Sequence, residues 1–415
     1  MSGTLVMNLN LLKYGIFTFI LILLFSCGAG EREERPPQLS TYFPDSVFID
    51  LDETLIEKRA RQIDSIFSGM AKNHWFNGSV LYVEKGRKVF CKAYGIADTR
   101  SKDPLTVHSA FQLASVSKMF TAMAIMILKE EGKLSYEDTI QQFIPEFPYP
   151  NISIRNLLTH RSGLSRYMSV AHEQWSDHQV PLTNEAVVEL YAKYRPNPYF
   201  RPDNGFHYCN TNYALLASIV ERISGLSFSE FVREKIFDPL GMDDSFVYNM
   251  DQDTLVPPYP DAAVQGHYYR SWRLIPQRNY YLNGVTGDKG IYTSAADLFK
   301  WDQALRYNKL VGDSTLREAF TPGSPKYWKR KDNYGFGWRI KESEDSTVFH
   351  FGWWRGFRTF YIKDLKQDKT IVVLTNKDKG PGSSTLWRII RDHSYDLGFI
   401  CRIPEEEYYP SDRKE

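Results

Sequence analysis

The sequence predicts a mixed α and β fold in which one antiparallel sheet is built from both chain ends and is flanked by helices. Three observations predict it. Strand-like segments occur near the N-terminus and again after residue 345, helical segments lie between them, and the helical stretch that begins at Ser115 is apolar on most sides. We therefore expect an inserted, mostly helical region at about 130–285.

The first expected strands form a hairpin. Residues 76–84 alternate in polarity, Lys85-Gly86 supplies a turn, and a second strand-like segment covers 88–95. Three further strands are expected near the other end of the chain, at 347–352, 357–362 and 370–375.

Helical patterns cover residues 115–132, 213–224 and 384–397. A helix that is apolar on most sides, as at 115–132, is expected to run through the middle of a domain. Residues 250–285 are rich in Pro, Tyr and polar groups, and we expect them to form a long irregular excursion.

The first 27 residues predict a lipoprotein signal peptide. Lys13 precedes an apolar run, Gly15 to Phe25, that is too short for a comfortable membrane span. The run ends shortly before Cys27, and a small residue followed by Cys resembles the bacterial lipoprotein processing site. The resemblance implies cleavage before Cys27 and lipidation of its thiol. An uncleaved anchor helix and an ordinary signal peptide are the alternatives.

The rest of the chain divides by composition. Residues 28–50 are expected to be a polar tether, 51–400 the folded domain and 401–415 a polar tail. We expect export to the bacterial cell envelope, periplasmic or on the outer surface, with the lipid on Cys27 holding the protein to a membrane.

Composition limits the partners and cofactors. The chain has 415 residues, 42% hydrophobic and 24% charged, with a formal net charge of +1, which gives no reason to expect nucleic acid as a partner. Aromatic residues reach 15%, which indicates a Tyr-rich core and surface, with a carbohydrate- or peptide-lined cleft as the alternative.

The cysteines and histidines predict no metal site and no other cofactor. If Cys27 carries lipid, three cysteines remain, an odd number that argues against a disulfide framework, and there is no CxxC pair. The chain has no His-Glu-x-x-His sequence. The histidines considered as metal ligands lack ligand spacing; they are His160, His172, His207 and His350.

Ser115 is the candidate nucleophile, because Ser115 and Lys118 form a Ser-x-x-Lys pair that opens the apolar helix. Residues three apart share one face of a helix. A serine hydroxyl needs a base, and lysine can be that base only when burial or a nearby positive charge disfavours its ammonium. The helix N-terminus also offers free N–H groups to a developing oxyanion. The same spacing recurs at Ser411 and Lys414, but in a charged tail that cannot be a buried site.

Tyr208 and Asn210 form a second candidate element, in a turn directly before the helical segment 213–224. A phenol near a lysine can act as a general base and later as a general acid. Asn210 can hold a substrate carbonyl or the lysine. Tyr-x-Asn also occurs at Tyr149 and Tyr281, so position rather than the tripeptide favours Tyr208. An N-cap Asn and a core Tyr is the alternative.

His350, Gly352 and Trp353 form a third candidate element, the only His-x-Gly sequence in the chain. On an edge strand, His350 would face the cleft, and the N–H after Gly352, that of Trp353, could be an oxyanion donor. A hydrogen-bonded core or surface histidine is the alternative.

Taken in this order, the three elements resemble the Ser-x-x-Lys, Tyr-x-Asn and Lys-or-His-x-Gly motifs of the serine β-lactamase and penicillin-binding-protein superfamily. The Tyr-x-Asn form is similar to the class C branch, with its D-aminopeptidases, D,D-carboxypeptidases and esterases. The resemblance covers roughly residues 60–395. Further matching segments are Phe76–Leu81, Ile154–Leu164, Phe237–Met242, Gly290–Leu298 and Tyr334–Trp338.

The resemblance implies a β-lactamase/transpeptidase-like fold and an acyl-enzyme mechanism. Ser115 would attack a carbonyl, Lys118 and Tyr208 would move its proton, and Asn210 would orient the substrate. The N–H groups of Ser115 and Trp353 would form the oxyanion hole, and water would then release the acyl group.

Two departures from the family pattern bear on the substrate. His350 stands where many relatives have Lys and lacks a permanent charge near neutral pH, which weakens recognition of a carboxylate. Trp353 and Trp354 fill positions that are often small in relatives. We therefore expect a D-amino-acid peptidase or an esterase rather than an efficient β-lactamase. A non-catalytic lipoprotein that binds or senses a cell-wall fragment or penicillin is the alternative. The oligomeric state stays open.

Overall fold

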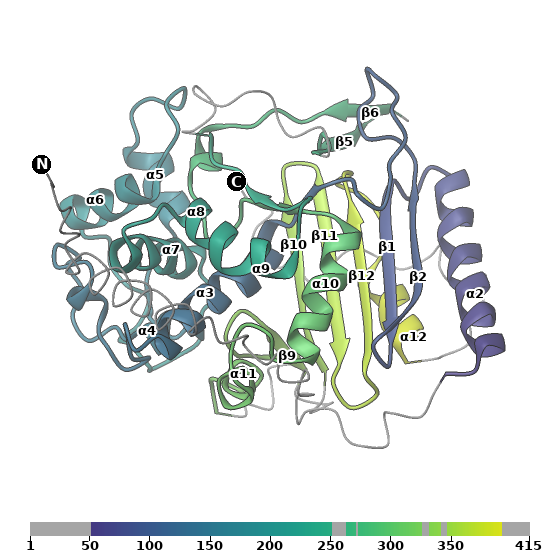
Figure 1. The fold of residues 1–415 in the computed structure, drawn as a ribbon. Helices are drawn as coiled ribbons and strands as arrows, with labels where there is room; N and C mark the ends of the chain where they lie inside the picture. The colour runs from purple at the N-terminus through teal and green to yellow at the C-terminus, as the bar shows by residue number, and fades with distance from the viewer. Residues whose placement is uncertain (1–50, 251–262, 271–272, 326–331, 342–346, 392–415) are drawn as a thin grey trace, which may run out of the picture. The chain divides into compact units, whose positions relative to one another are not determined.

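Strands from the two ends of the chain meet in one seven-stranded sheet, with the order β2-β1-β12-β11-β10-β9-β8. Every neighbouring pair in it is antiparallel. Figure 1 shows the early, purple-blue strands β1 and β2 beside the late, yellow-green strands. The predicted mixed α and β fold with a sheet drawn from both chain ends is confirmed.

The computed structural model describes residues 51–250, 263–270, 273–325, 332–341 and 347–391. The predicted signal peptide, Cys27, the tether and the polar tail lie outside the described residues. Among the described helices, none has the length and apolar character needed to cross a membrane.

The predicted strands are present. The sheet consists of β1 (Gly78–Glu84), β2 (Arg87–Tyr94), β8 (Asp332–Tyr334), β9 (Arg339–Lys341), β10 (Thr347–Trp354), β11 (Phe357–Asp364) and β12 (Lys369–Thr375). The expected alternation of β1 does not give it an exposed face, because all seven of its residues are buried. The strands β2 and β12 pair with the two edges of β1, and helices cover both of its faces.

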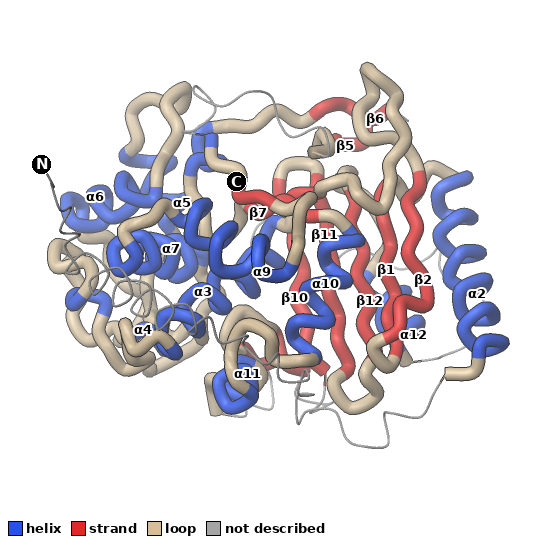
Figure 2. The backbone as a smooth tube through the Cα atoms, viewed as in Figure 1, coloured by secondary structure: helices blue, strands red, loops and turns tan. Residues whose placement is uncertain are grey.

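Two hydrophobic clusters lie on opposite faces of the sheet. On one face, α2 (Glu53–Lys72) and α12 (Ser383–Ile390) pack residues such as Phe67 and Trp387 against Phe349 and Val373. On the other face, α10 (Ala295–Arg306) and the helical region pack against residues such as Val372. Figure 2 shows the helical region as a separate mass beside the red strands. The closing helix predicted at 384–397 is therefore present as α12, up to the last described residues.

The inserted region is mostly helical. Its first elements are the 3₁₀ turn η2 (Ala114–Ser117), α3 (Lys118–Glu130), η3 (Ile140–Gln142), α4 (Ile154–Leu158), α5 (Tyr167–Gln174), α6 (Asn184–Tyr194) and α7 (Asn210–Ser224). It continues with α8 (Phe228–Val232), the π-helical turn η4 (Arg233–Phe237), α9 (Asp238–Leu240) and the 3₁₀ turn η6 (Tyr281–Gly284). After it come α10 and α11 (Asp313–Ala319).

Two small sheets complete the described fold. One has the order β3 (Phe111–Gln112), β7 (Ile291–Thr293), β4 (Phe246–Val247), and the other pairs β5 (His267–Arg270) with β6 (Arg273–Pro276). The prediction that 250–285 is irregular is thus wrong for the β5–β6 pair. Four residues in each strand are too few for sequence periodicity to reveal them.

Side chains in the sequence fix where several helices begin. Ser153 and Ser227 each form a reciprocal capping box at the start of α4 and α8. Thr183 and Ser294 each accept a backbone N–H at the start of α6 and α10. Gly225 takes the left-handed conformation that ends α7.

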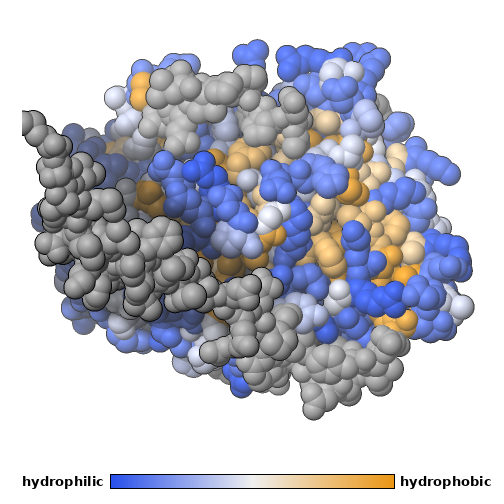
Figure 3. Space-filling view, in the orientation of Figure 1, coloured by the Kyte–Doolittle hydropathy of each residue, from blue (hydrophilic) through white to orange (hydrophobic). Residues whose placement is uncertain are grey.

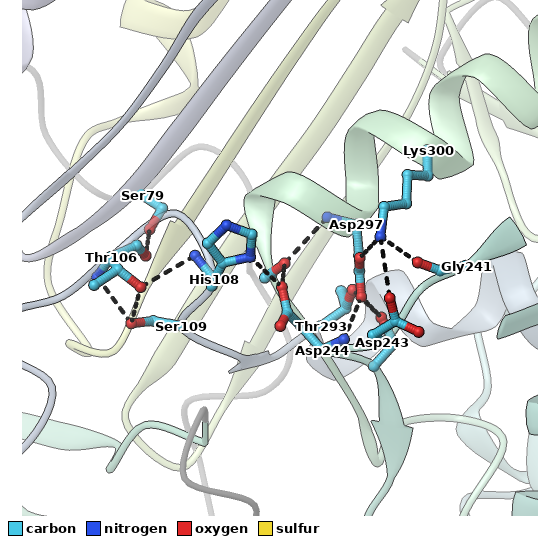
Figure 4. A network of polar contacts seen from close by, with 12 residues as sticks. Ser79, Thr106, His108, Ser109, Gly241, Asp243, Asp244, Thr293, Asp297 and Lys300 are labelled. Carbon is cyan, nitrogen blue, oxygen red and sulfur yellow. Dashed lines mark hydrogen bonds and ion pairs between the residues drawn. The ribbon is translucent and has the colours of Figure 1, made fainter. Parts of the chain in front are cut away.

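A polar network holds the start of α10 in place (Figure 4). Ser294 donates to Asp244 at 2.7 Å, and Asp297 accepts from the Asp244 N–H and from Ser245, each at 2.8 Å. His108 contacts Asp244 at 2.9 Å, so the network reaches the turn before β3. The space-filling view in the orientation of Figure 1 shows hydrophilic residues around a more apolar centre on the face toward the viewer (Figure 3).

Candidate active site

Ser115 and Lys118 lie in direct contact at the junction of η2 and α3. The Lys118 Nζ atom donates a hydrogen bond to the Ser115 Oγ atom at 3.1 Å. Side chains three residues apart eclipse each other in a 3₁₀ turn, so the turn brings the hydroxyl and the amine together. The sequence placed Ser115 on the helix itself, whereas the structure places it on the tighter turn that precedes α3.

The backbone around Ser115 is held in an uncommon conformation. Ala114 has a φ of 49°, in the left-handed region that disfavours residues other than glycine. The preceding residue, Leu113, is fixed on both sides: its N–H donates to the Ile291 carbonyl at 2.8 Å, and its carbonyl accepts from the Thr359 hydroxyl at 2.7 Å. The sheet therefore locks the turn that carries Ser115.

Gly352 explains why β10 can approach that turn. A Cβ atom at this position would overlap the Leu113 carbonyl oxygen and the Thr359 hydroxyl, and would lie 3.1 Å from the Ala114 Cβ atom. Glycine at the third element is therefore required by the close packing of β10 against η2. Glycine is required in the same way at position 337, because a Cβ atom there would lie 2.7 Å from the Lys118 carbonyl oxygen, at the start of α3.

Lys118 is fully buried and still able to lose its proton near neutral pH. Its side chain is 0% exposed, and burial lowers its pKa to about 7. The nearby Asp288 carboxylate opposes this shift, and the Arg339 guanidinium reinforces it. Lys118 Nζ also donates to the Asp288 main-chain carbonyl at 2.8 Å, which fixes its orientation. A buried lysine with this pKa can accept a proton from a serine hydroxyl.

Tyr208 lies beside this pair. Its ring centroid is 5.1 Å from Lys118 Nζ and 6.0 Å from the centroid of the His350 ring. The ring also packs at 4.4 Å against His160, whose Nδ1 atom accepts the Cys209 N–H at 3.2 Å. The structure thus brings together Ser115, Lys118 and Tyr208, which are far apart in the sequence.

Asn210 is the first residue of α7, and Cys209 is its N-cap. The alternative in which Asn210 merely caps the helix therefore does not apply. Its Nδ2 atom lies 4.0 Å from Met168 Sδ, and its buried Oδ1 atom has no hydrogen-bond partner among the described residues. Such an oxygen can accept an N–H group from a substrate.

His350 differs from its prediction. It was expected on an edge strand, facing a cleft, but β9 pairs with β10 at Val348 and Phe349, so His350 lies just beyond the paired residues, and its imidazole is 1% exposed. Nδ1 donates to the Phe351 carbonyl at 2.9 Å, and Nε2 accepts from the Tyr334 hydroxyl at 2.9 Å. Burial lowers the pKa of His350 well below its usual value, so the ring is neutral near pH 7.

Trp353 presents its backbone, not its side chain, to the site. Arg355 and Gly356 form a two-residue turn with φ values of 41° and 87°, so the flanking pair Trp354–Phe357 closes the hairpin by hydrogen bonds. Hydrogen-bonded pairs alternate along an antiparallel ladder, and the Trp353 N–H therefore points away from β11, toward the edge that β9 leaves open beyond Phe349.

The side chains of the two tryptophans lie on different faces of the sheet. Trp353, 52% exposed, shares its face with Phe349 and Phe351, whereas Gly352 faces the Ser115 turn. The Trp353 side chain therefore lies on the face of the sheet opposite to the Ser115 turn. Trp354 lies on the face of Gly352, where its Nε1 atom donates to Asn283 at 3.3 Å.

Arg339 is a site residue that the sequence reasoning missed. It lies on β9, with its guanidinium carbon 5.0 Å from the centroid of the Tyr208 ring. Its positive charge lowers the pKa of Lys118, His160 and His350, and no ion pair is recorded for it among the described residues. One feature of the sequence could have pointed to Arg339: it directly follows the segment Tyr334–Trp338, which resembles the family.

The described residues contain no group of three or more His, Cys, Asp and Glu side chains that could hold a metal ion. Cys209 is buried, Cys91 is partly buried, and both are free thiols.

This fold and this site define a class. An antiparallel sheet joined to a helical region, with a serine and a buried lysine where the central helix begins, is the β-lactamase and penicillin-binding-protein architecture. The chain belongs to the Beta-lactamase family, whose sequence profile matches residues 63–394.

Individual relatives agree with the family. Penicillin-binding protein 4* of Bacillus subtilis (strain 168) is 35% identical over 334 residues, which cover 78% of this chain and 73% of that protein. The crystal structure of a penicillin-binding protein from Bacillus halodurans superposes with a TM-score of 0.67 at 27% identity, over 78% of this chain and 98% of that one.

A more distant structure shares the fold. The D-amino acid amidase of Ochrobactrum anthropi SV3 superposes with a TM-score of 0.61 at 22% identity, over 77% of this chain and 91% of that one. The family match and the relatives of higher identity confirm the predicted superfamily resemblance.

Proposed function

We propose that this protein is a serine hydrolase that forms an acyl-enzyme on Ser115 and cleaves an amide or an ester. One observation carries the proposal. Lys118 is fully buried, has a pKa of about 7, and donates to the Ser115 hydroxyl at 3.1 Å. A neutral lysine in that place can activate a serine that is otherwise a poor nucleophile.

In the acylation step, the Ser115 Oγ atom forms a bond to the substrate carbonyl carbon. Its proton passes to the neutral Lys118 amine, either directly or through Tyr208, whose hydroxyl gives its own proton to the amine as it takes the one from Ser115. The N–H groups of Ser115 and Trp353 hold the resulting oxyanion. The bond from carbon to the leaving nitrogen or oxygen then breaks, and Tyr208 returns the proton to the leaving group. Water then forms a bond to the acyl carbon, the bond from that carbon to Ser115 Oγ breaks, the product leaves as a carboxylic acid, and a proton from the water returns to Ser115.

The charges around the site bear on the substrate class. His350 is neutral and hydrogen-bonded at both nitrogens, so it does not supply the charge that a substrate carboxylate requires. Arg339 supplies a permanent positive charge beside Tyr208. We favour a D-amino-acid peptide or an ester as substrate and place β-lactams second. The shared fold of a D-amino acid amidase is consistent with this choice.

We further propose that the protein is exported and anchored to a membrane of the bacterial cell envelope through a lipid on Cys27. The signal-peptide pattern before Cys27 supports this location, as does similarity to a bacterial penicillin-binding protein. Mass spectrometry of the mature protein tests it: a lipid on Cys27 that disappears in Cys27→Ala is expected. A mature protein without lipid, or one that keeps residues 1–26, would contradict it.

The hydrolase proposal is tested by labelling with a fluorescent fluorophosphonate and a fluorescent penicillin. We expect an adduct on Ser115 in the wild type, none in Ser115→Ala, and none in Lys118→Arg, because a guanidinium stays charged. Ser411→Ala is the matched control, since it alters the other Ser-x-x-Lys sequence and should leave labelling intact.

Absence of a Ser115-dependent adduct with both probes would favour the non-catalytic binding protein. Normal labelling of Lys118→Arg would remove the proton role assigned to Lys118. A panel of D-Ala peptides, short esters and β-lactams, followed by mass spectrometry of the Ser115 adduct, then identifies the acyl group.

A further inference from the structure

A second buried lysine lies next to the Ser115–Lys118 pair. Lys289 is 3% exposed, and its Nζ atom lies 3.3 Å from Asp288 Oδ1. It also donates to the Tyr167 hydroxyl at 2.8 Å and to the Val285 carbonyl at 3.1 Å. Tyr167 in turn donates to Asp288 Oδ2 at 3.1 Å. The three side chains form a closed, buried hydrogen-bonded cluster.

Asp288 connects this cluster to Lys118 through its backbone. The Asp288 main-chain carbonyl accepts from Lys118 Nζ at 2.8 Å, while the Asp288 carboxylate is bound by Lys289 and Tyr167. The same segment is fixed along α3 by Thr121, whose hydroxyl donates to the Gly287 carbonyl at 2.7 Å. Asp288 thus binds Lys118 through its main-chain carbonyl and Lys289 through its carboxylate.

An unpaired carboxylate at this place would hinder Lys118. A negative charge near a buried amine favours the ammonium form, and the Asp288 carboxylate does act on Lys118 in that direction. A buried cation paired with the carboxylate offsets that effect, and Lys289 is such a cation. Burial lowers the pKa of Lys289, while the Asp288 charge opposes that shift.

Other groups also face Lys118 and are common to every variant considered below. The charged or titratable groups around it, apart from the cluster, are Ser115, Arg339 on β9, Cys209 before α7, His160, His350 on β10, Tyr208 and Tyr213. Among these, Arg339 disfavours the ammonium form of Lys118, and a Cys209 thiolate would favour it. Among the described residues, Arg339 and Cys209 form no hydrogen bond with Lys289 or Asp288.

We propose that Lys289 is a positioning residue: as the buried counterion of Asp288 it holds the carboxylate away from Lys118, so that Lys118 can take the proton of Ser115. The proposal rests on the proposed function. It assigns to Lys289 no contact with substrate, and its effect reaches the reaction only through the protonation of Lys118.

The test compares Lys289→Met with Asp288→Asn. In Lys289→Met the carboxylate loses its counterion, so the pH at which Ser115 labelling reaches half its maximal rate should rise. Labelling at pH 6 should then fall about tenfold, with little change in the maximal rate at high pH. In Asp288→Asn the remaining Lys289 charge disfavours the Lys118 ammonium, so the midpoint should fall. The variant that lacks both charges should return toward the wild type.

A merely structural cluster gives a different result. Loss of packing would lower labelling at every pH in both variants without moving the midpoint, and that outcome, or a shift in the same direction in both, overturns the proposal. Thermal unfolding shows which variants fold; if Lys289→Met does not, Lys289→Gln, which also removes the charge, takes its place.

The two proposals fail differently. A wild type that takes no label on Ser115 removes the proposed function. In that case nitrogen NMR of the Lys118 side chain reads its protonation without any reaction. Opposite shifts of the Lys118 titration in the two variants would support the role of Lys289, and superimposed titrations would overturn it.

Discussion

Lys118 is a buried amine, and its burial affects stability as well as chemistry. Its pKa in the folded protein is lowered to about 7, mainly by burial, whereas an unfolded chain has a lysine pKa of about 10.4. Between these two values the unfolded chain holds one more proton than the folded protein. Lys118 therefore makes the free energy of unfolding rise with pH in this window, by about 1.4 kcal/mol per pH unit, and leaves it lowest below pH 7.

We predict that Lys118→Met is more stable than the wild type at pH 7, because it removes the penalty of burying an amine. The advantage should shrink as the pH rises toward 10, since the variant lacks the slope that Lys118 contributes. Chemical denaturation of both proteins at a series of pH values measures it. Lys58→Met, at an exposed position on α2, is the control. Parallel stability curves for wild type and Lys118→Met would contradict the prediction.

Gly352 is the second residue at which a single atom matters. We predict that Gly352→Ala lowers the free energy of unfolding by about 1–3 kcal/mol, because its Cβ would force β10 away from the Ser115 turn. Ser115 labelling should fall further than stability alone explains. Gly69→Ala is the matched control. Gly69 lies in α2, and nothing lies within 4 Å of the added Cβ atom. This substitution should raise the free energy of unfolding by about 0.5–1 kcal/mol. Equal effects at the two positions would refute the argument.

At the scale of the elements, the sequence predicted those with a strong period or a clear turn. The hairpin β1–β2 and the strands β10 to β12 were found because their polarity or composition and their turns agree. The three-residue strand β9 was not, because so short a segment carries no period. That omission left Arg339 unnoticed and hid the burial of His350, since both depend on knowing what lies beside β10.

The same limit applies within the site. The three motifs located Ser115, Lys118 and Tyr208 because each has a characteristic spacing. The side-chain direction of Trp353 could not be predicted, because it depends on which face of β10 meets η2, and only the packing of Gly352 reveals that. The Asp288–Lys289 pair gave no signal, since adjacent charged residues are ordinary on a surface and their burial is a tertiary property.

The attachment of α10 to the sheet depends on a buried ion pair. Lys363 on β11 donates to Asp302 on α10 at 2.8 Å, and each side chain is 1% exposed. Tyr361 and Thr370 also donate to the same carboxylate. Removing the acid would leave a buried ammonium without its counterion, which is far more damaging than losing a surface pair.

We predict that Asp302→Ala lowers the free energy of unfolding by about 3–5 kcal/mol. Glu57→Ala, which removes the exposed pair with Arg61 on α2, should lower it by less than about 1 kcal/mol. Urea denaturation of both variants provides the measurement. A loss below about 1 kcal/mol in Asp302→Ala would mean that the buried pair does not fasten α10.

For the molecule as a whole, α3 is the element that the sheet and the helical region share. Its residues belong to the larger hydrophobic cluster, which joins one face of the sheet to the helices α4 to α10. The Ser115 turn at its start is locked by β11 and β7 through Leu113. The two parts of the fold therefore have few ways to unfold separately.

We predict that Phe120→Ala destabilises both parts together. Phe120 is fully buried on α3. The centroid of its ring lies 4.2 Å from that of Trp301 on α10 and 5.8 Å from that of Phe237 in η4. Truncation should lower the free energy of unfolding by about 3–5 kcal/mol. Calorimetry should show one transition in the wild type and one, at lower temperature, in the variant, because the cavity weakens contacts on both sides of α3. Two separated transitions, with only one of them moved by the substitution, would mean that the helical region and the sheet unfold independently and that α3 belongs to one of them alone.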